Sequence, residues 1–363
     1  MPANVETMFS VKETPWHKLG VVILNAPSIK EGISLAGLDW DVRVDSLTRP
    51  DGLNVDGFAK AFVRSDNNAT LGVVGPKTHP LQNKTAFDFF QSFVDANEAF
   101  LETAGSLDEG RKVWVMAKIS RPNSEIVKGD EVAKFVLLSN AHDGTTAVRV
   151  GFTPIRVVCA NTLAMAHGDK ASKLIRVRHS KAVEKNLEAV RETMNLADEE
   201  FEATAEQFRF LASRQINASD LRKYVKTVFK MNPDDNEIST RSSNILDEIL
   251  RHHEEKTHMV ASWVEAIKLK ELAAVKEKEA ETANLLESVL AKTEEFFEAG
   301  RGTDNAPSRG SYWTAYNAVN EYLNYERGHN PDTRLNSLWF GQNAATNRVA
   351  LEVATTMADG KNA

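Results

Sequence analysis

The chain has one cysteine, Cys159, and no long apolar run. A single cysteine excludes an intramolecular disulfide framework and a zinc site built from several cysteines, and it suits a reducing compartment. No window holds enough uninterrupted apolar residues to cross a bilayer, and the first 20 residues lack the apolar core of a signal peptide. We therefore expect a soluble cytoplasmic protein that does not enter a membrane.

An excess of positive charge is also missing. The 44 lysines and arginines face 51 aspartates and glutamates, so the formal net charge is −7. This balance argues against a protein that coats DNA with a generally basic surface, although a local basic segment could still bind phosphate. Hydrophobic residues make up 42% of the 363 positions, which is enough for a packed core in one large domain or two.

The first half of the chain is rich in β-branched residues and turn signals. Apolar and polar residues alternate, or apolar runs occur, at residues 40–44, 59–64, 71–74, 100–107, 112–119, 134–138 and 149–158, and these segments are predicted strands. Residues 83–96 have helical spacing. Asn161 and Thr162, after the last strand, are expected to cap a following helix. Residues 1–180 are thus predicted to form an α+β domain with a mostly antiparallel sheet.

From about residue 180 the strand signals end and charged, helix-forming runs begin. Helices are predicted at residues 181–216, 219–229, 237–255 and 262–297, with Ser219 as the N-cap of the second. Residues 181–299 are therefore predicted to be a charged helical region. The fold class that follows is α+β, with a long α-helical region after the N-terminal sheet.

The last segment, residues 300–363, is predicted to be a loop at 300–310 followed by helices at 311–325 and 335–357. Trp313 and Tyr316 lie three positions apart, so they share one face of the first of these helices. Such an aromatic face could stack on bases, but packing is the better interpretation. We expect this segment to pack back on the N-terminal domain.

Several short motifs identify the chain with a family. They are Glu6-Thr7-Met8-Phe9, Pro15-Trp16-His17-Lys18-Leu19-Gly20, Leu71-Gly72-Val73-Val74-Gly75, Gln82-Asn83, Ala104-Gly105-Ser106-Leu107, Gly110-Arg111, His142-Asp143-Gly144, Arg156-Val157-Val158-Cys159-Ala160-Asn161-Thr162-Leu163, Asn317-Ala318-Val319 and Glu321-Tyr322. The sequence resembles, almost end to end, the phage/plasmid-like proteins that carry domain of unknown function 932. This resemblance implies a mobile-element origin in a bacterial host, in replication, recombination or counter-defence, and it implies no particular reaction.

The strongest functional signal is a basic segment after the cysteine motif. Residues 167–191 hold seven lysines and arginines against three carboxylates, in a chain that is acidic overall. On a strand, Arg176 and Arg178 share one face with Leu174, and such a row could follow a phosphate backbone. The alternative is a solvated strand edge, where basic side chains discourage edge-to-edge pairing. The candidate nucleic-acid-binding residues are Lys170, Lys173, Arg176, Arg178, Lys181 and Lys185.

Catalysis and metal binding have weaker signals. Cys159 could be a nucleophile because Arg156 would lower the pKa of its thiol, but its apolar neighbours are typical of a buried cysteine. The histidines that could serve as a base are His142, His167 and His179. His253-Glu254 would need a second histidine at Thr257 to bind zinc as HExxH, and the histidine is at 258 instead. No catalytic residue, metal or cofactor is therefore assigned.

The favoured hypothesis is a nucleic-acid-binding protein of phage or plasmid DNA metabolism, acting in single-strand annealing or recombination. The alternative is a helical adaptor or host-factor-binding protein of counter-defence, whose acidic helices meet a basic host partner, with no catalytic activity. An enzyme that depends on the Cys159 thiol is the third hypothesis. The expected partners are a nucleic acid and, under the alternative, a host protein, while single- or double-strand preference and homo-oligomer formation stay open.

Overall fold

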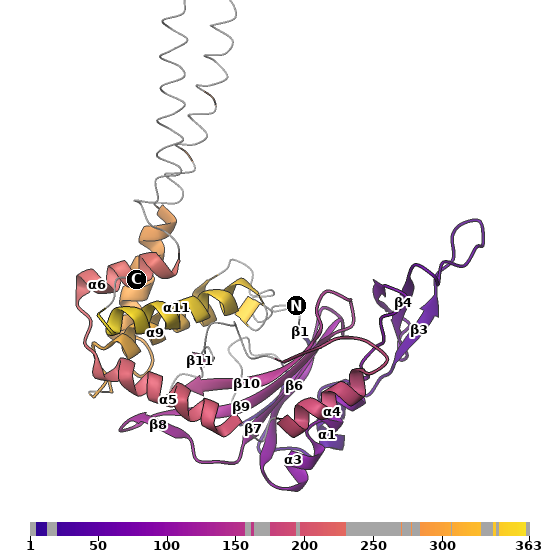
Figure 1. Ribbon diagram of the computed structural model, residues 1–363, viewed down its shortest axis with the longest axis horizontal. Helices are drawn as coiled ribbons and strands as arrows, with labels where there is room; N and C mark the ends of the chain where they lie inside the picture. The colour runs from indigo at the N-terminus through magenta and orange to yellow at the C-terminus, as the bar shows by residue number, and fades with distance from the viewer. Residues whose placement is uncertain are drawn as a thin grey trace, which may run out of the picture.

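The computed structural model describes residues 5–12, 20–156, 161–162, 175–193, 197–229, 270, 277, 284–305, 307–327, 337–338 and 341–360. Within these residues a large curved sheet occupies the middle of the molecule, with a small sheet at one end and a group of helices at the other (Figure 1). Helices and strands are both abundant, and the sheet-rich part precedes the long helices. The predicted α+β class is therefore confirmed.

The main sheet contains nine described strands in the order β11-β10-β9-β7-β6-β1-β2, with β12 also on β10 and β8 also on β9. All pairings are antiparallel except that of β1 with β2. The strands are β1 (Val5–Val11), β2 (Val21–Ile23), β6 (Ala99–Leu107), β7 (Lys112–Ile119), β8 (Ser124–Val127), β9 (Asp130–Ala141), β10 (Val148–Arg156), β11 (Asn161–Thr162) and β12 (Ile175–Val177).

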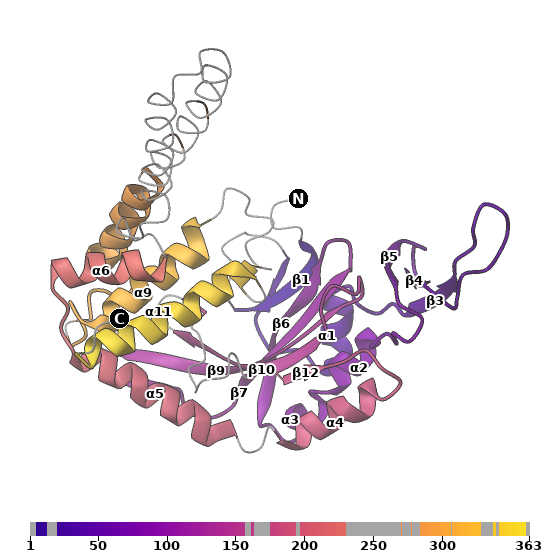
Figure 2. The same cartoon turned by 45° about the horizontal axis from the view of Figure 1, so that its top comes forward.

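The small sheet is an antiparallel meander of β3 (Val42–Ser46), β4 (Lys60–Arg64) and β5 (Thr70–Val74). It projects from the end of the main sheet, as Figures 1 and 2 show. Its β4–β5 turn contains Asn68, whose positive φ of 60° is tolerated by asparagine. The long β3–β4 connection carries two exposed apolar side chains, Leu53 and Phe58.

Four helices cover one face of the main sheet. They are α1 (Ile29–Leu35), α2 (Asn83–Asp88), α3 (Gln91–Asp95) and α4 (Val183–Thr193). Val183, Leu187 and Val190 recur at helical spacing on α4 and are buried in the same core as Val148 and Val150 of β10. The predicted helix at 83–96 thus corresponds to two short helices, and α4 belongs to the core of the sheet.

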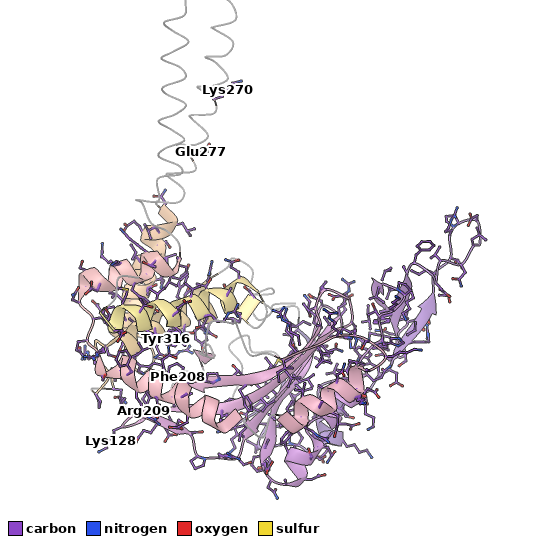
Figure 3. All side chains as sticks on the ribbon, in the orientation of Figure 1. Lys128, Phe208, Arg209, Lys270, Glu277 and Tyr316 are labelled. Atoms are coloured by element: carbon purple, nitrogen blue, oxygen red, sulfur yellow. The ribbon has the colours of Figure 1, made fainter. Side chains whose placement is uncertain are left out.

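The remaining described helices form a second core, which we call the helical unit. It comprises α5 (Ala197–Ser213), α6 (Ala218–Val228), α9 (Tyr312–Glu321), η3 (Tyr322–Glu326) and α11 (Gln342–Ala358), together with helical residues 284–299. Phe208 of α5 and Tyr316 of α9 lie with ring centroids 6.0 Å apart in its centre (Figure 3). The predicted helix at 181–216 covers both α4 and α5, and most of the predicted helices at 237–255 and 262–297 lie outside the described residues.

The helical unit is joined to the sheet by one buried and one exposed hydrogen bond. Trp313 Nε1 donates a hydrogen bond of 2.8 Å to Asp130 Oδ2 at the start of β9, and both residues are fully buried. Arg209 Nε donates to the Glu125 carbonyl oxygen of β8 at 3.0 Å. The helix that contains Trp313 thus contacts β9, while the predicted packing of residues 300–363 on the N-terminal domain and the predicted boundaries after residues 180 and 299 stay predictions.

Asn161 and Thr162 form strand β11 and pair with Arg156 and Ile155 of β10. The helix that they were predicted to cap lies outside the described residues. The prediction of Ser219 as the N-cap of α6 was wrong, because Asn217 holds that position and its side chain accepts from the Asp220 backbone N–H at 2.9 Å.

Within the described part of the chain, no helix has both the length and the apolar character needed to cross a membrane.

Candidate nucleic-acid interface

Four of the six predicted basic residues lie on exposed positions between β12 and the first turns of α4. Arg176 is on β12, Arg178 and Lys181 follow it, and Lys185 is on α4, and all four are exposed. Lys170 and Lys173 lie outside the described residues. We call the exposed stretch of chain that carries Arg176, Arg178, Lys181 and Lys185 the basic segment. Arg176 projects from one face of the sheet, whereas Lys185 lies on α4, which covers the other face.

The sequence pattern explains why these side chains face solvent. Val177 pairs with Val148 of β10 and is buried with the sheet core, so Arg176 points to the opposite face of the sheet. On α4 the apolar residues face the sheet, which leaves Lys185 outward beside Glu184 and Glu188. Because α4 carries both signs of charge, the positive character is concentrated at β12 and its C-terminal end.

The register of the sheet adds an arginine that the sequence analysis did not select. Arg149 of β10 is directly opposite Arg176 of β12, so the two side chains project from neighbouring strands on the same face. Burial lowers the pKa of Arg149, and the charges of Arg176 and Arg348 lower it further. The alternation of buried Val148 and Val150 around Arg149 was the signal in the sequence that could have found it.

Arg348 of α11 is the third member of this group. Burial and then the charge of Arg176 lower the pKa of Arg348. Figures 1 and 2 show α11 on the side of the main sheet opposite α3 and α4, with its first turns directed toward the middle of the sheet. No local pattern in the sequence could have linked Arg348 to Arg149 and Arg176, because it comes from a helix near the other end of the chain.

The connection between β12 and α4 is held in place by two histidines. The His79 backbone N–H donates to the His179 carbonyl oxygen at 3.0 Å, and His179 Nδ1 donates back to the His79 carbonyl oxygen at 3.1 Å. Burial lowers the pKa of His179, which favours the neutral ring. His179, a candidate base in the sequence, therefore positions the backbone that carries Arg178 and Lys181.

The comparison with protein families identifies the chain. The family model described as domain of unknown function (DUF932) matches residues 70–348, which is more than half of the chain. The protein belongs to this family. The matched range contains the whole basic segment together with Arg149 and Arg348. No curated protein and no solved structure matched the chain.

The motif residues of this DUF932 protein converge where the small sheet meets the main sheet. Gln82 forms two hydrogen bonds with the backbone of Val42, as a neighbouring strand would. Asn83 Nδ2 donates to the Trp40 carbonyl oxygen, which directs Asn83 Oδ1 to His142 Nε2 at 3.0 Å. These contacts fix the orientation of β3 on the end of the main sheet.

His142 has a structural role in this junction. Asn83 Oδ1 can only accept, so Nε2 of His142 carries the proton in this network. Burial lowers the pKa of His142 to about 3, and the charges of His179 and Arg64 act in the same direction. A neutral and fully buried ring does not exchange protons with a substrate near neutral pH. His142 is therefore not a candidate base.

A second cluster at the same junction is built around Arg64, whose side chain is only 5% exposed. Arg64 forms ion pairs with Glu6 and Asp66, each at 2.7 Å, and its guanidinium lies 4.4 Å from the centre of the Trp40 ring. Ser106 of β6 donates to Glu6 Oε2 at 3.0 Å. Both carboxylates hold the single guanidinium, so the cluster fixes β4 to β1 and β6 and leaves no free positive charge for an anionic ligand.

Catalytic and metal-binding candidates gain no support from the described residues. No group of three or more histidine, cysteine, aspartate or glutamate side chains there could hold a metal ion. Cys159, His167, His252, His253 and His258 lie outside the described residues. The arrangement that the described part of the chain offers for chemistry is thus the arginine-rich edge of the main sheet.

Proposed function

We propose that this DUF932 protein binds the phosphate backbone of a nucleic acid through the basic segment and acts in the DNA metabolism of a phage or plasmid, in the cytoplasm of the bacterial host. Single-strand annealing or recombination is the context that fits this activity. The observation that carries the proposal is the placement of Arg176 opposite Arg149 at the edge of the sheet, next to exposed Arg178.

Three properties of this edge support the proposal. A planar guanidinium donates two parallel hydrogen bonds to a phosphate, so arginines suit contacts with a nucleic-acid backbone. Like charges directly opposite on neighbouring strands repel each other, and a bound polyanion would remove this repulsion. Among the described residues, Arg176 forms no ion pair with a carboxylate. Its charge is therefore accessible to a ligand.

A binding titration with fluorescent single- and double-stranded oligonucleotides at low salt tests the proposal. We expect the double variant Arg176→Glu, Arg178→Glu to weaken binding at least about 100-fold, since two phosphate contacts become repulsive. Lys223→Glu on α6 makes the charge change of one of these two substitutions at an exposed position of the helical unit, and it should change affinity by less than about threefold. Absence of binding by the unmodified protein at low salt, or equal loss in the control, would contradict the proposal.

A second function, as an adaptor for a host protein, is favoured by the β3–β4 connection. Phe58 is 84% exposed and Leu53 is 59% exposed, on the small sheet that projects from the molecule (Figure 2). Exposed apolar side chains of this size are typical of interaction sites. Under this hypothesis Phe58→Ser abolishes the stoichiometric recovery of a host protein from lysate and leaves oligonucleotide binding unchanged. Recovery of the same partner by Phe58→Ser would reject the hypothesis.

A further inference from the structure

The strand at one edge of the main sheet is apolar and uncharged. β2 is the last strand in the sheet order, and within the described residues β1 is the only strand that pairs with it. Val21, Val22 and Leu24 are 53%, 41% and 78% exposed. The sequence has no charged residue between Lys18 and Lys30. Edge strands usually carry charged side chains that prevent pairing with another chain, so an exposed apolar edge is a site where a further strand can pair.

The other edge of the same sheet has the opposite character. β12 lies there beside β10 and carries Arg176, and Arg178 follows it. Because both side chains are exposed and positive, a second copy of this edge would be repelled. The two edges therefore suit different partners: the basic edge suits an anion, and β2 suits an uncharged strand.

A backbone hydrogen bond shows which groups of β2 are available for pairing. The Lys12 N–H donates to the Ile23 carbonyl oxygen at 2.7 Å, so the backbone polar groups of Ile23 point toward β1. These groups alternate in direction along a strand, so the N–H and C=O of Val22 point to the open edge. Gly20 allows β2 to lie this close to β1, because a Cβ atom there would lie 2.7 Å from the Met8 carbonyl oxygen.

A second copy of this chain is the partner that fits such an edge. Two identical strands can pair antiparallel across a two-fold axis, where each meets the same surface that it presents. We propose that β2 forms a homodimer by pairing with β2 of a second copy, with the two Val22 residues opposite each other at the axis and exchanging both backbone hydrogen bonds. Since neither strand carries a charge, the pairing brings no like charges together.

The side chains of β2 support this register. Ile23 packs against the core of the main sheet, and Val21 of the second copy lies opposite it on the same face. Leu24 lies opposite Gly20 of the second copy, where the absence of a side chain leaves room. The dimer has one continuous sheet with a basic segment at each far edge. An interface of this length buries less than the roughly 1,200 Å² of a standard one, so we expect a dissociation constant on the order of 10 µM.

Sedimentation velocity of the full-length protein between about 1 and 200 µM tests the inference, because this range spans the expected dissociation constant. We expect the unmodified protein to change from monomer to dimer. Val22→Lys and Val22→Glu should each stay monomeric, because like charges meet at the axis, and an equimolar mixture of the two should dimerise again. The control is Val44→Lys on β3, which changes a side chain that is 45% exposed and should dimerise as the unmodified protein does.

The mixture separates a broken interface from a misfolded variant, since opposite charges restore pairing only between folded strands. An unmodified protein that is monomeric throughout the range, or dimerisation of Val22→Lys alone, would overturn the inference. So would a mixture that remains monomeric. Neither the pairing nor its test requires nucleic-acid binding.

Disulfide cross-linking of the Cys159→Ser protein tests the register. Val22→Cys places two thiols opposite each other, where Cα atoms about 5.5 Å apart can be bridged. The two Leu24→Cys thiols would be four residues apart along the paired strands, or about 14 Å, which a disulfide cannot span. We expect Val22→Cys to form the linked dimer at least about tenfold faster. Leu24 is the more exposed residue, so random collision would favour Leu24→Cys, and that order or equal rates would refute the pairing.

Discussion

Gly110 shows how single residues fix the junction between the two sheets. Its φ is +86°, and a Cβ atom there would lie 2.9 Å from both Arg64 Nη1 and the Trp40 ring. The glycine therefore meets two requirements, a left-handed backbone and space for a buried guanidinium against an indole. Gly72 is needed for space alone, because a Cβ atom at this position would lie 2.6 Å from the Asp143 Cα atom. Motif residues such as these build the scaffold that supports the basic edge.

We predict that Gly110→Ala lowers the free energy of unfolding by about 3 kcal/mol, from about 1 kcal/mol of backbone strain and about 2 kcal/mol of steric overlap. The control is Gly52→Ala, since Gly52 has a φ of +83° but no atom within 4 Å of an added Cβ. Gly52→Ala should lower the free energy of unfolding only by the backbone strain of about 1 kcal/mol. Urea denaturation of both variants measures the difference, and equal costs would show that Arg64 and Trp40 move aside.

The neutral state of His142 predicts how stability depends on pH. Its pKa is about 3 in the folded protein and about 6.5 when unfolded, so the unfolded chain binds more protons between these values. The stabilisation is complete above pH 6.5 and is lost as the pH falls toward 3, by up to about 1.4 kcal/mol per unit. His142→Gln keeps a donor for Asn83 and removes the titration. Its stability should fall less steeply between pH 6.5 and pH 4.5, and parallel curves for the two proteins would refute a neutral buried His142.

At the scale of single elements, capping contacts and strand pairing fixed the boundaries that sequence patterns alone did not predict. Asn217 and Ser219 are both residue types that favour the N-cap position, and the sequence-based prediction of Ser219 was wrong. The structure selects Asn217, whose extended backbone and side-chain bond to the Asp220 N–H begin α6 there. The strand predicted at 149–158 corresponds to β10. The adjacent Asn161 and Thr162 form a short strand that pairs with the end of β10.

Asn217→Ala should therefore destabilise the protein by about 1 kcal/mol, through the loss of the cap at the start of α6. Ser219→Ala should change the free energy of unfolding by less than about 0.5 kcal/mol, because Ser219 is exposed and lies inside the first turn. Chemical denaturation with tryptophan fluorescence as the signal measures both values. A larger effect at Ser219 than at Asn217 would contradict the capping assignment.

At the scale of the whole molecule, local patterns predicted the class of the fold and most of its strands, but not its long-range contacts. Alternation in residues 112–119 and 149–158 reflects a sheet with one core-facing side, which a single segment can reveal. The pairing of Arg149 with Arg176, and the approach of Arg348, depend on register and on the packing of distant helices. Four of the predicted basic residues are exposed along one stretch of the chain, and the two additional arginines could only be found in three dimensions.

The central claim is that the β10–β12 edge neutralises nucleic-acid phosphates. The most direct measurement is the slope of the logarithm of the binding constant against the logarithm of salt concentration, because each phosphate contact contributes about 0.7 to 0.9 to it. We predict that the double variant Arg176→Ala, Arg178→Ala reduces the magnitude of this slope by about 1.4 to 1.8, while Lys223→Ala leaves it unchanged. An unchanged slope in the arginine variant, or a binding constant of the unmodified protein that does not depend on salt, would contradict the account.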